Sequence, residues 1–176
     1  DQFLRDTPNQ RTDAYGGSLE NRARLLFEVL TAVTQAIGSE RVGLRLSPLN
    51  SYNSMKDSDP LALIGFLADR LNAFKLAYLH VMRADFFGVQ KADVMPVARE
   101  KYKGVLVGNM GYSADEAEAA IAEGRLDAVA FGTAFLANPD LPARIRAKAP
   151  LNAPDSNTFY AGGAKGYTDY PTLQVA

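Results

Sequence analysis

The chain contains 176 residues, and 47% of them are hydrophobic, as is typical of a globular domain that can bury a sizeable core. Its 19 basic and 20 acidic residues give a net charge of -1, which argues against a nucleic acid or an anionic membrane as partner. The absence of cysteine excludes disulfides, thiolate zinc sites, cysteine nucleophiles and iron–sulfur clusters. Residues 1–6 show no signal-peptide pattern and no apolar run is long enough to span a membrane, so we expect a cytoplasmic protein.

The first predicted helix follows a polar, turn-rich loop over residues 1–17. Ser18 is a favourable N-cap, and Gly38 is a favourable end. Between them, apolar residues recur at steps of three and four, as on one face of a helix: Leu19, Ala23, Leu26, Phe27, Leu30, Val33 and Ile37.

The period then changes to two. Over residues 42–47, Leu44 and Leu46 alternate with Gly43, Arg45 and Ser47 before a proline ends the run. This alternation predicts a strand with the leucines facing helices and the arginine facing the opposite side of the sheet.

Three further strands, each followed by a helix, are predicted downstream. The helix after the first strand begins at Asp59-Pro60, a cap followed by proline at the first helical position. Ser113 and Glu116 form the pattern of a capping box. The expected strands are 78–82, 105–109 and 128–132, and the expected helices are about 93–101, from Ser113 to Gly124, and from Asn138-Pro139 to before Pro150.

Such alternation predicts a parallel sheet, either an open doubly wound sheet or a barrel. No strand is followed by a complete dinucleotide-binding glycine motif, which favours the barrel. Four units make half of an eightfold barrel, which needs about 250 residues. We therefore expect an α/β fold, the C-terminal half of a (β/α)8 TIM barrel, closed by an N-terminal half as partner. It comprises a leading loop at 1–17, a helix and four units at 18–149, and an aromatic tail at 150–176.

Arg45 is the first candidate site residue. An arginine near the C-terminal end of a barrel strand points toward the end where barrel enzymes carry their chemistry, and its permanent charge requires an anion. An ion pair with a carboxylate elsewhere in the barrel is the structural alternative.

Two glycine-containing strand ends form the second candidate. Gly108 and Asn109 end one strand, and Gly132 and Thr133 end the next. Backbone N–H groups at such turns can converge on a phosphate. Ordinary tight turns between strand and helix would look the same when taken singly.

Other residues are less decisive. We expect His80 to be a buried, hydrogen-bonded core residue without a catalytic role. Phe86 either lines a pocket or packs its loop, and the aromatic tail that contains Tyr160 either folds over the barrel mouth or covers its outside. We expect no metal site, and neither a nucleophilic triad nor a pair of catalytic carboxylates is supported.

Taken together, these motifs resemble the Old Yellow Enzyme family, in particular the bacterial N-ethylmaleimide reductase type. The resemblance runs along essentially the whole chain, in order, through five groups: Arg11 to Arg22, Val42 to Pro48, Gly108 to Gly111, Asn138 to Leu141, and the tail from Thr158 to Pro171.

This resemblance implies a barrel with FMN across its mouth and NAD(P)H as hydride donor, reducing small activated alkenes such as enones, maleimides and nitroolefins. It implies that Arg45 lies beside flavin N1 and the C2 oxygen and stabilises the reduced flavin. It further implies that Gly108, Asn109 and Gly132 contact the phosphate side and that Tyr160 lies near the substrate pocket.

Three departures from the family pattern matter. Thr133 stands where many relatives carry an arginine that pairs with the phosphate, so we expect weaker FMN binding. Arg83-Ala84-Asp85 replaces an acidic-proline sequence, so we expect a reshaped loop at Phe86. The family's proton-donor motif falls upstream of Asp1, so we expect no turnover by this chain without the N-terminal half.

Three alternatives remain. A dienoyl-CoA-type reductase would need cysteines for an iron–sulfur cluster. A phosphate-binding aldolase or isomerase would need an interior lysine or carboxylate pair. A non-catalytic half-barrel interaction or scaffold module would bind no flavin even when completed.

Overall fold

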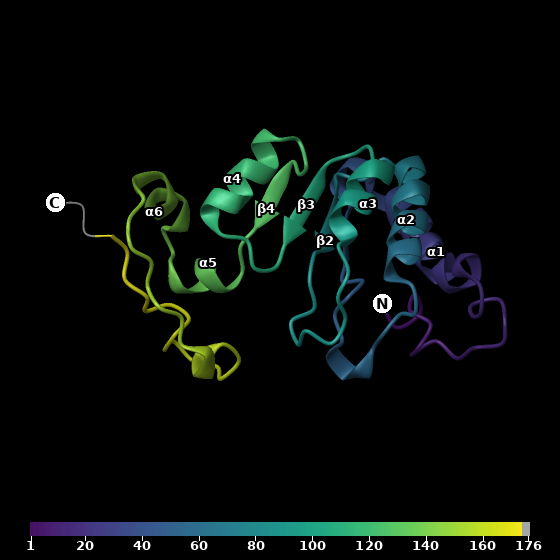
Figure 1. Cartoon of the computed structure of the whole chain (residues 1–176), viewed down its shortest axis with the longest axis horizontal. Helices are drawn as coiled ribbons and strands as arrows, with labels where there is room; N and C mark the ends of the chain where they lie inside the picture. The colour runs from purple at the N-terminus through teal and green to yellow at the C-terminus, as the bar shows by residue number, and fades with distance from the viewer. Residues whose placement is uncertain (174–176) are drawn as a thin grey trace. The chain divides into compact units, whose positions relative to one another are not determined.

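The computed structural model describes residues 1–173 of the chain (Figure 1). The chain divides into two compact units, Asp1–Ala130 and Phe131–Ala176, and each is considered by itself. One half-barrel domain over residues 1–176 stays a prediction.

The first unit contains a four-stranded parallel sheet in the order β1-β2-β3-β4, as predicted (Figure 1). The strands are β1 Gly43–Leu46, β2 Tyr78–Met82, β3 Leu106–Asn109 and β4 Ala128–Ala130. The register places Arg45 of β1 beside His80 of β2, and His80 beside Val107 of β3. Consecutive parallel neighbours joined by helices are what successive βα units of a barrel require.

The helices begin and end close to the predicted positions. They are α1 Leu19–Ile37, α2 Pro60–Leu71, α3 Val94–Lys101, α4 Ala114–Ala122, α5 Thr133–Ala137 and α6 Leu141–Ala147, with 3-10 turns at Ser39–Arg41, Tyr52–Ser54, Asn72–Phe74 and Ser156–Thr158. The helix caps predicted at Ser18, Asp59 and Ser113 are confirmed. Side chains of Ser18, Asp59 and Ser113 accept hydrogen bonds from backbone N–H groups three residues on. Gly38 ends α1 at a φ of 88°, a value that favours glycine.

Two local predictions are wrong. The last helix does not begin at Asn138-Pro139 but at Leu141, and the short helix α5 precedes it. Asn138 is fully buried instead, and its side-chain amide donates to the carbonyl oxygen of Ala134. The capping box at α4 forms only in part, because the Glu116 side chain pairs with Arg83.

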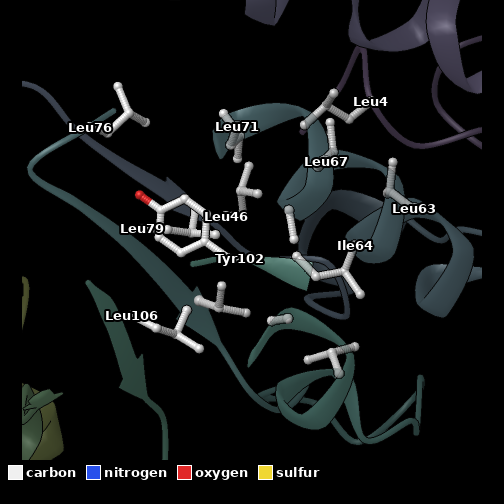
Figure 2. Close-up of a cluster of buried hydrophobic side chains, with 14 of the residues drawn as sticks. Leu4, Leu46, Leu63, Ile64, Leu67, Leu71, Leu76, Leu79, Tyr102 and Leu106 are labelled. Carbon is white, nitrogen blue, oxygen red and sulfur yellow. The ribbon is translucent and has the colours of Figure 1, made fainter. Parts of the chain in front are cut away.

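The hydrophobic core lies on the helix side of the sheet (Figure 2). Leu46, Leu79 and Leu106, one from each of the first three strands, are buried there. They pack with apolar residues of α1, α2 and α3, among them Leu30, Leu63, Ile64, Leu67 and Ala98. Leu44 packs against the same cluster, so the two leucines of the first strand face the helices as the alternation predicts.

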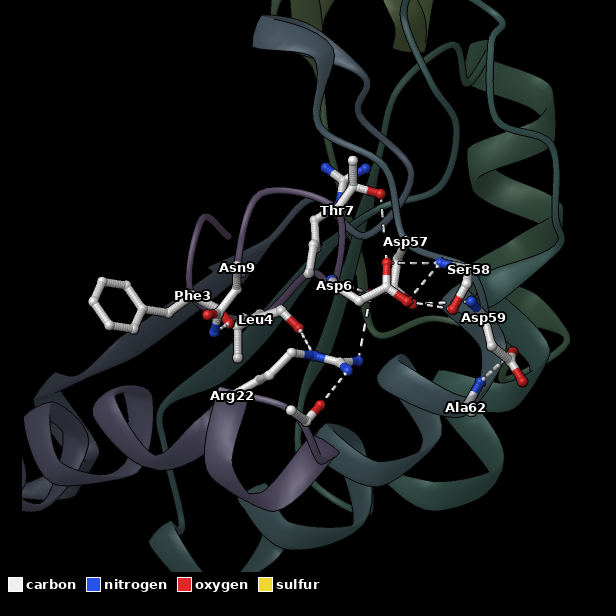
Figure 3. A network of polar contacts seen from close by, with 12 residues as sticks. Phe3, Leu4, Asp6, Thr7, Asn9, Arg22, Asp57, Ser58, Asp59 and Ala62 are labelled. Atoms are coloured by element: carbon white, nitrogen blue, oxygen red, sulfur yellow. Dashed lines mark hydrogen bonds and ion pairs between the residues drawn. The ribbon is translucent and has the colours of Figure 1, made fainter. Parts of the chain in front are cut away.

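The N-terminal segment is tied to this unit by a polar network (Figure 3). The Arg22 guanidinium donates to the carbonyl oxygens of Leu4 and Gly17 and pairs with Asp57 at 3.5 Å. Asp57 in turn accepts a hydrogen bond from the backbone N–H of Asp6. The motif over residues 11–22 therefore anchors the leading loop to the loop that follows β1.

In the second unit, the tail returns to α6 through a buried arginine. Arg144 pairs with Asp140 and donates to the carbonyl oxygens of Pro150 and Pro171. Asn152 donates to the same carbonyl oxygen of Pro171. In the described part of the chain, no helix combines the length and hydropathy that crossing a membrane would need.

A candidate cofactor-binding face

The face of the sheet opposite the core carries polar side chains. Arg45 is exposed on this face and donates to the Ser47 hydroxyl at 2.9 Å and to Oδ1 of Asn109 at 3.4 Å. The nitrogen that donates to Asn109, Nη2, also lies 3.8 Å from the sulfur of Met82. These partners come from β2, β3 and the residue after β1, so the three neighbouring strands orient this side chain together.

All of these partners are electrically neutral. Within residues 1–173, no aspartate or glutamate forms an ion pair with Arg45. The ion pair considered as the structural alternative is therefore not made by the described part of this chain. A guanidinium cannot lose its proton at any physiological pH. Its charge is available to an anionic or electron-rich group on this face.

His80 lies on the same face, which corrects its assignment as a hydrogen-bonded core residue. It is partly buried beside Arg45, and its Nε2 atom is buried without a hydrogen-bond partner among the described residues. Burial, and then the positive charge of Arg45, lower the pKa of His80, while the Asn109 side chain opposes the shift. The imidazole is therefore neutral near pH 7.

Gly108 and Asn109 are separated by the strand alternation. The Asn109 side chain lies on the polar face with Arg45. A Cβ on Gly108 would instead point at the helix layer, 2.6 Å from Cδ1 of Leu126 and 3.1 Å from the Tyr112 hydroxyl. Close packing therefore accounts for glycine at this position, and any contact of Gly108 with a ligand would be through its backbone.

Two loops leave the C-terminal edges of β1 and β2, and we call them the mouth loops: residues 47–58 and 83–93. The first carries Tyr52, and the second carries Phe86 and Phe87. Phe86 is 70% exposed, and its ring lies edge-on to that of Phe87, with centroids 5.2 Å apart. Phe86 therefore does not pack its loop against the core of this unit, and its place in a pocket stays a prediction.

Arg83 begins the second mouth loop and ties it to the end of β3. Its guanidinium donates to the carbonyl oxygens of Met110 and Gly111, both at 2.8 Å. It also pairs with Glu116 and lies over the Tyr112 ring, 3.6 Å from the centroid. Arg83, which departs from the family pattern, thus forms an ion pair with Glu116 of α4.

In the second unit, Gly132 caps the short helix α5 and Thr133 is its first residue. A Cβ on Gly132 would meet nothing within 4 Å, so the backbone here is open. Tyr160 is 99% exposed. The role of these three residues stays a prediction.

Three residues of the site were missed by sequence reasoning. Met82 and His80 lie in a strand that is apolar on both faces, so no alternation marked which of its residues face Arg45. Asp85 is 8% exposed and bonded to both mouth loops. The signal available for Asp85 was its place three residues after the end of a strand.

Comparisons with known proteins agree with this geometry. Residues 1–152 match the model of the NADH:flavin oxidoreductase / NADH oxidase family. A probable flavin mononucleotide-dependent alkene reductase of Leishmania infantum is 58% identical over 174 residues, covering 98% of this chain and 47% of the relative. This chain spans about half the length of the curated relatives it matches.

Two solved structures extend the similarity. The old yellow enzyme from Trypanosoma cruzi is 43% identical with a TM-score of 0.95, and the match covers 98% of this chain and 46% of that chain. Morphinone reductase in complex with tetrahydroNAD is 45% identical with a TM-score of 0.89, covering 98% and 47%. The four-stranded parallel half-barrel and the resemblance read from the sequence are both confirmed. The chain belongs to the NADH:flavin oxidoreductase / NADH oxidase family, which includes relatives named old yellow enzymes and FMN-dependent alkene reductases.

Proposed function

We propose that the chain forms part of an FMN-dependent oxidoreductase that reduces activated C=C bonds. The observation that carries this proposal is Arg45, a permanent cation on the open face of the sheet with only neutral partners among residues 1–173. The family and the names of the relatives support the same activity. Enones, maleimides and nitroolefins are the substrate classes that we propose.

The residues of this face fit an FMN group. The isoalloxazine carries carbonyl oxygens and ring nitrogens that accept hydrogen bonds from a guanidinium, and its reduced form carries negative charge. Arg45 offers a positive charge, and Nε2 of His80 is a buried polar atom without a partner in the described residues. We propose that Arg45 holds the ring system and, from the resemblance, that Asn109 contacts the phosphate side. The backbone of Gly108 is a proposed phosphate contact of the first unit. For the second unit by itself, the resemblance alone proposes Gly132 and Thr133 as phosphate contacts.

FMN, when bound, supplies the two-electron hydride chemistry of the reaction. Arg45 contributes electrostatics: a fixed charge aimed at the site where negative charge accumulates needs no reorganisation during the reaction. Ser47, just after β1, and Asn109 of β3 hold the guanidinium, so its direction is set before any ligand arrives. Phe86 is proposed to lie at the substrate side of the mouth. Tyr160, in the second unit, is proposed as a substrate-pocket residue from the resemblance alone.

Three further parts of the proposal concern groups outside this chain. We propose NAD(P)H as the hydride donor, supported by the tetrahydroNAD named in the morphinone reductase complex. We propose that the proton donor comes from outside residues 1–176. The remaining strands would come from an N-terminal half, with which this chain closes one barrel.

The surface of the first unit supports such a partner. Tyr78 on β2 is 43% exposed, as expected for a sheet face that another half of the barrel would cover. On α1, Val29, Val33 and Ile37 form an exposed apolar stripe at steps of four residues. The free edge of β1 also offers unpaired backbone groups.

The test joins this chain to the N-terminal half of the Leishmania infantum relative, in place of the segment that it matches. We call this protein the completed barrel. We expect it to retain FMN through gel filtration, shown by flavin absorption, and to reduce N-ethylmaleimide with NADH or NADPH. A completed barrel that is folded by circular dichroism but stays colourless after FMN loading contradicts the proposal and favours the scaffold alternative.

A further inference from the structure

The mouth loops carry a cluster of aromatic rings that little apolar burial holds in place. Tyr52, Phe86 and Phe87 are 57%, 70% and 55% exposed. Tyr52 stacks on Phe87 with centroids 6.2 Å apart, although the two residues belong to different loops. Because the rings bury so little surface, the backbone of the loops must determine where they lie.

One carboxylate fastens that backbone. Oδ1 of Asp85 accepts hydrogen bonds from the backbone N–H and the hydroxyl of Ser51, at 2.9 and 3.1 Å, and from the N–H of Phe87 at 3.2 Å. Oδ2 accepts from the N–H groups of Val89 and Gln90, at 2.8 and 3.0 Å. Asp85 thus links the first mouth loop, next to Tyr52, to the second mouth loop on both sides of Gly88.

The charge state of this carboxylate suits the task. Burial alone would raise the pKa of Asp85, but the hydrogen bonds from Ser51, Gln90 and Phe87 outweigh it and hold the pKa well below its usual range. The group is therefore ionised at every pH at which an enzyme would work. An ionised carboxylate accepts on both oxygens at once, whereas an amide of the same shape accepts on only one.

The side chain of Arg5 makes a second set of contacts with the same two loops. Arg5 is fully buried and donates to the carbonyl oxygens of Asn50 and Met55 in the first loop. It also donates to Oε1 of Gln90 in the second loop at 2.7 Å. None of these Arg5 contacts involves residues 86–89. The hydrogen bonds to the Asp85 carboxylate therefore hold the part of the second loop that contains Phe86 and Phe87.

We propose that Asp85 is a positioning residue, which locks the two mouth loops together so that Tyr52, Phe86 and Phe87 present one preformed aromatic wall to the substrate. This inference rests on the proposed function. Loops that are ordered before binding spare the ligand the entropic cost of ordering them. Asp85 acts through these loops and touches neither the cofactor nor the reacting atoms.

The test compares Asp85→Asn with Asp93→Asn in the completed barrel. Asp93 lies in the same mouth loop and is exposed, and its side chain does not cap α3, so it is a matched control. Amide hydrogen exchange at residues 51 and 87–90 should accelerate at least tenfold in Asp85→Asn and stay unchanged in Asp93→Asn. This measurement needs no FMN. The KM for N-ethylmaleimide should rise about tenfold, as expected when a binding wall must be ordered anew, while FMN retention and reduction by NADPH stay unchanged.

Ser51→Ala removes one of the five hydrogen bonds and keeps the carboxylate, so it tests the same inference in a milder variant. Its exchange rates and KM should change in the same direction by a smaller factor. Unchanged exchange in both variants overturns the positioning role, and faster exchange with an unchanged KM overturns the link to substrate binding. Loss of FMN in the unmutated completed barrel would instead contradict the proposed function, while the exchange result would still stand.

Discussion

Arg45 and His80 lie side by side on neighbouring strands, and only Arg45 carries a positive charge near pH 7. Burial, and then the positive charge of Arg45, lower the pKa of His80 and so keep the partly buried imidazole neutral. A second positive charge beside the first would raise the energy of the folded state. The face therefore presents one fixed cation rather than a pair whose charge would vary with pH.

Replacing Arg45 tests the electrostatic role. In the completed barrel, Arg45→Ala should lower the reduction potential of bound FMN by about 60 mV, the two-electron equivalent of the ~2.7 kcal/mol that one preorganised donor supplies. Potentiometric titration of the flavin measures it. Arg41→Ala, an exposed arginine before the same strand, is the control and should leave the potential unchanged. Equal potentials for all three proteins would refute the assignment.

His80 leads to a prediction about acid stability. Because its pKa is lowered in the folded chain, the neutral form contributes stability that is complete above the unfolded value of about 6.5 and is lost as pH falls below it. His80→Gln cannot titrate, so its unfolding midpoint in urea should fall less between pH 7.5 and 5.5 than that of the unmutated protein. Parallel decreases would show that the imidazole does not drive the effect.

At the scale of single elements, the helix starts follow from local hydrogen bonding. Ser18, Asp59 and Ser113 each satisfy a backbone N–H that has no partner inside its helix. The capping box expected at α4 needed the Glu116 side chain to turn back toward Ser113. Arg83, from the loop after β2, takes that carboxylate instead. The ion pair with Arg83, which the local sequence pattern does not indicate, therefore determines where the Glu116 side chain lies.

The cap of α4 can be tested directly. The Ser113 hydroxyl accepts from the backbone N–H of Glu116 at 3.1 Å, so Ser113→Ala should reduce the free energy of unfolding by about 1 kcal/mol. Ser113→Asp keeps an acceptor at the same place and should restore most of the loss. Urea unfolding of the completed barrel measures both, and an alanine variant as stable as the original would show that this cap contributes nothing.

At the scale of the whole molecule, the open sheet face and the stripe on α1 bear on how the barrel closes. Val33 is 37% exposed at the centre of the stripe. Burying a valine side chain contributes about 1.5–3 kcal/mol, so a charge at this position should oppose the docking of any partner that covers it.

Supplying the two halves as separate chains measures that docking. Val33→Asp should weaken association by about tenfold or more, which corresponds to the loss of ~1.5 kcal/mol. Gln35→Asp places the same charge on the opposite side of α1, where the exposed residue is already polar, and should change the affinity little. Isothermal titration calorimetry provides the dissociation constants. Equal affinities for both variants would mean that the stripe is not part of the interface.

The sequence alone was sufficient for the parallel sheet, the starts of α1, α2 and α4, and the direction of Arg45. Each depends on neighbours a few residues away: a period of two along β1, a period near 3.6 along α1, and a capping side chain before each of these three helices. The half-barrel followed from counting strand–helix units, since four cannot close a barrel that needs eight.

Only the tertiary structure decided which polar atoms meet. His80 lies in a strand that is apolar on both faces, so only pairing with β1 and β3 shows that it stands beside Arg45. Asp85 binds Ser51, 34 positions away, because two parallel strands end at the same edge of the sheet. Periodicity reports which way a side chain points relative to its own backbone. It carries no information about which distant segment the folded chain brings to that side, and that choice is made by the packing of the core.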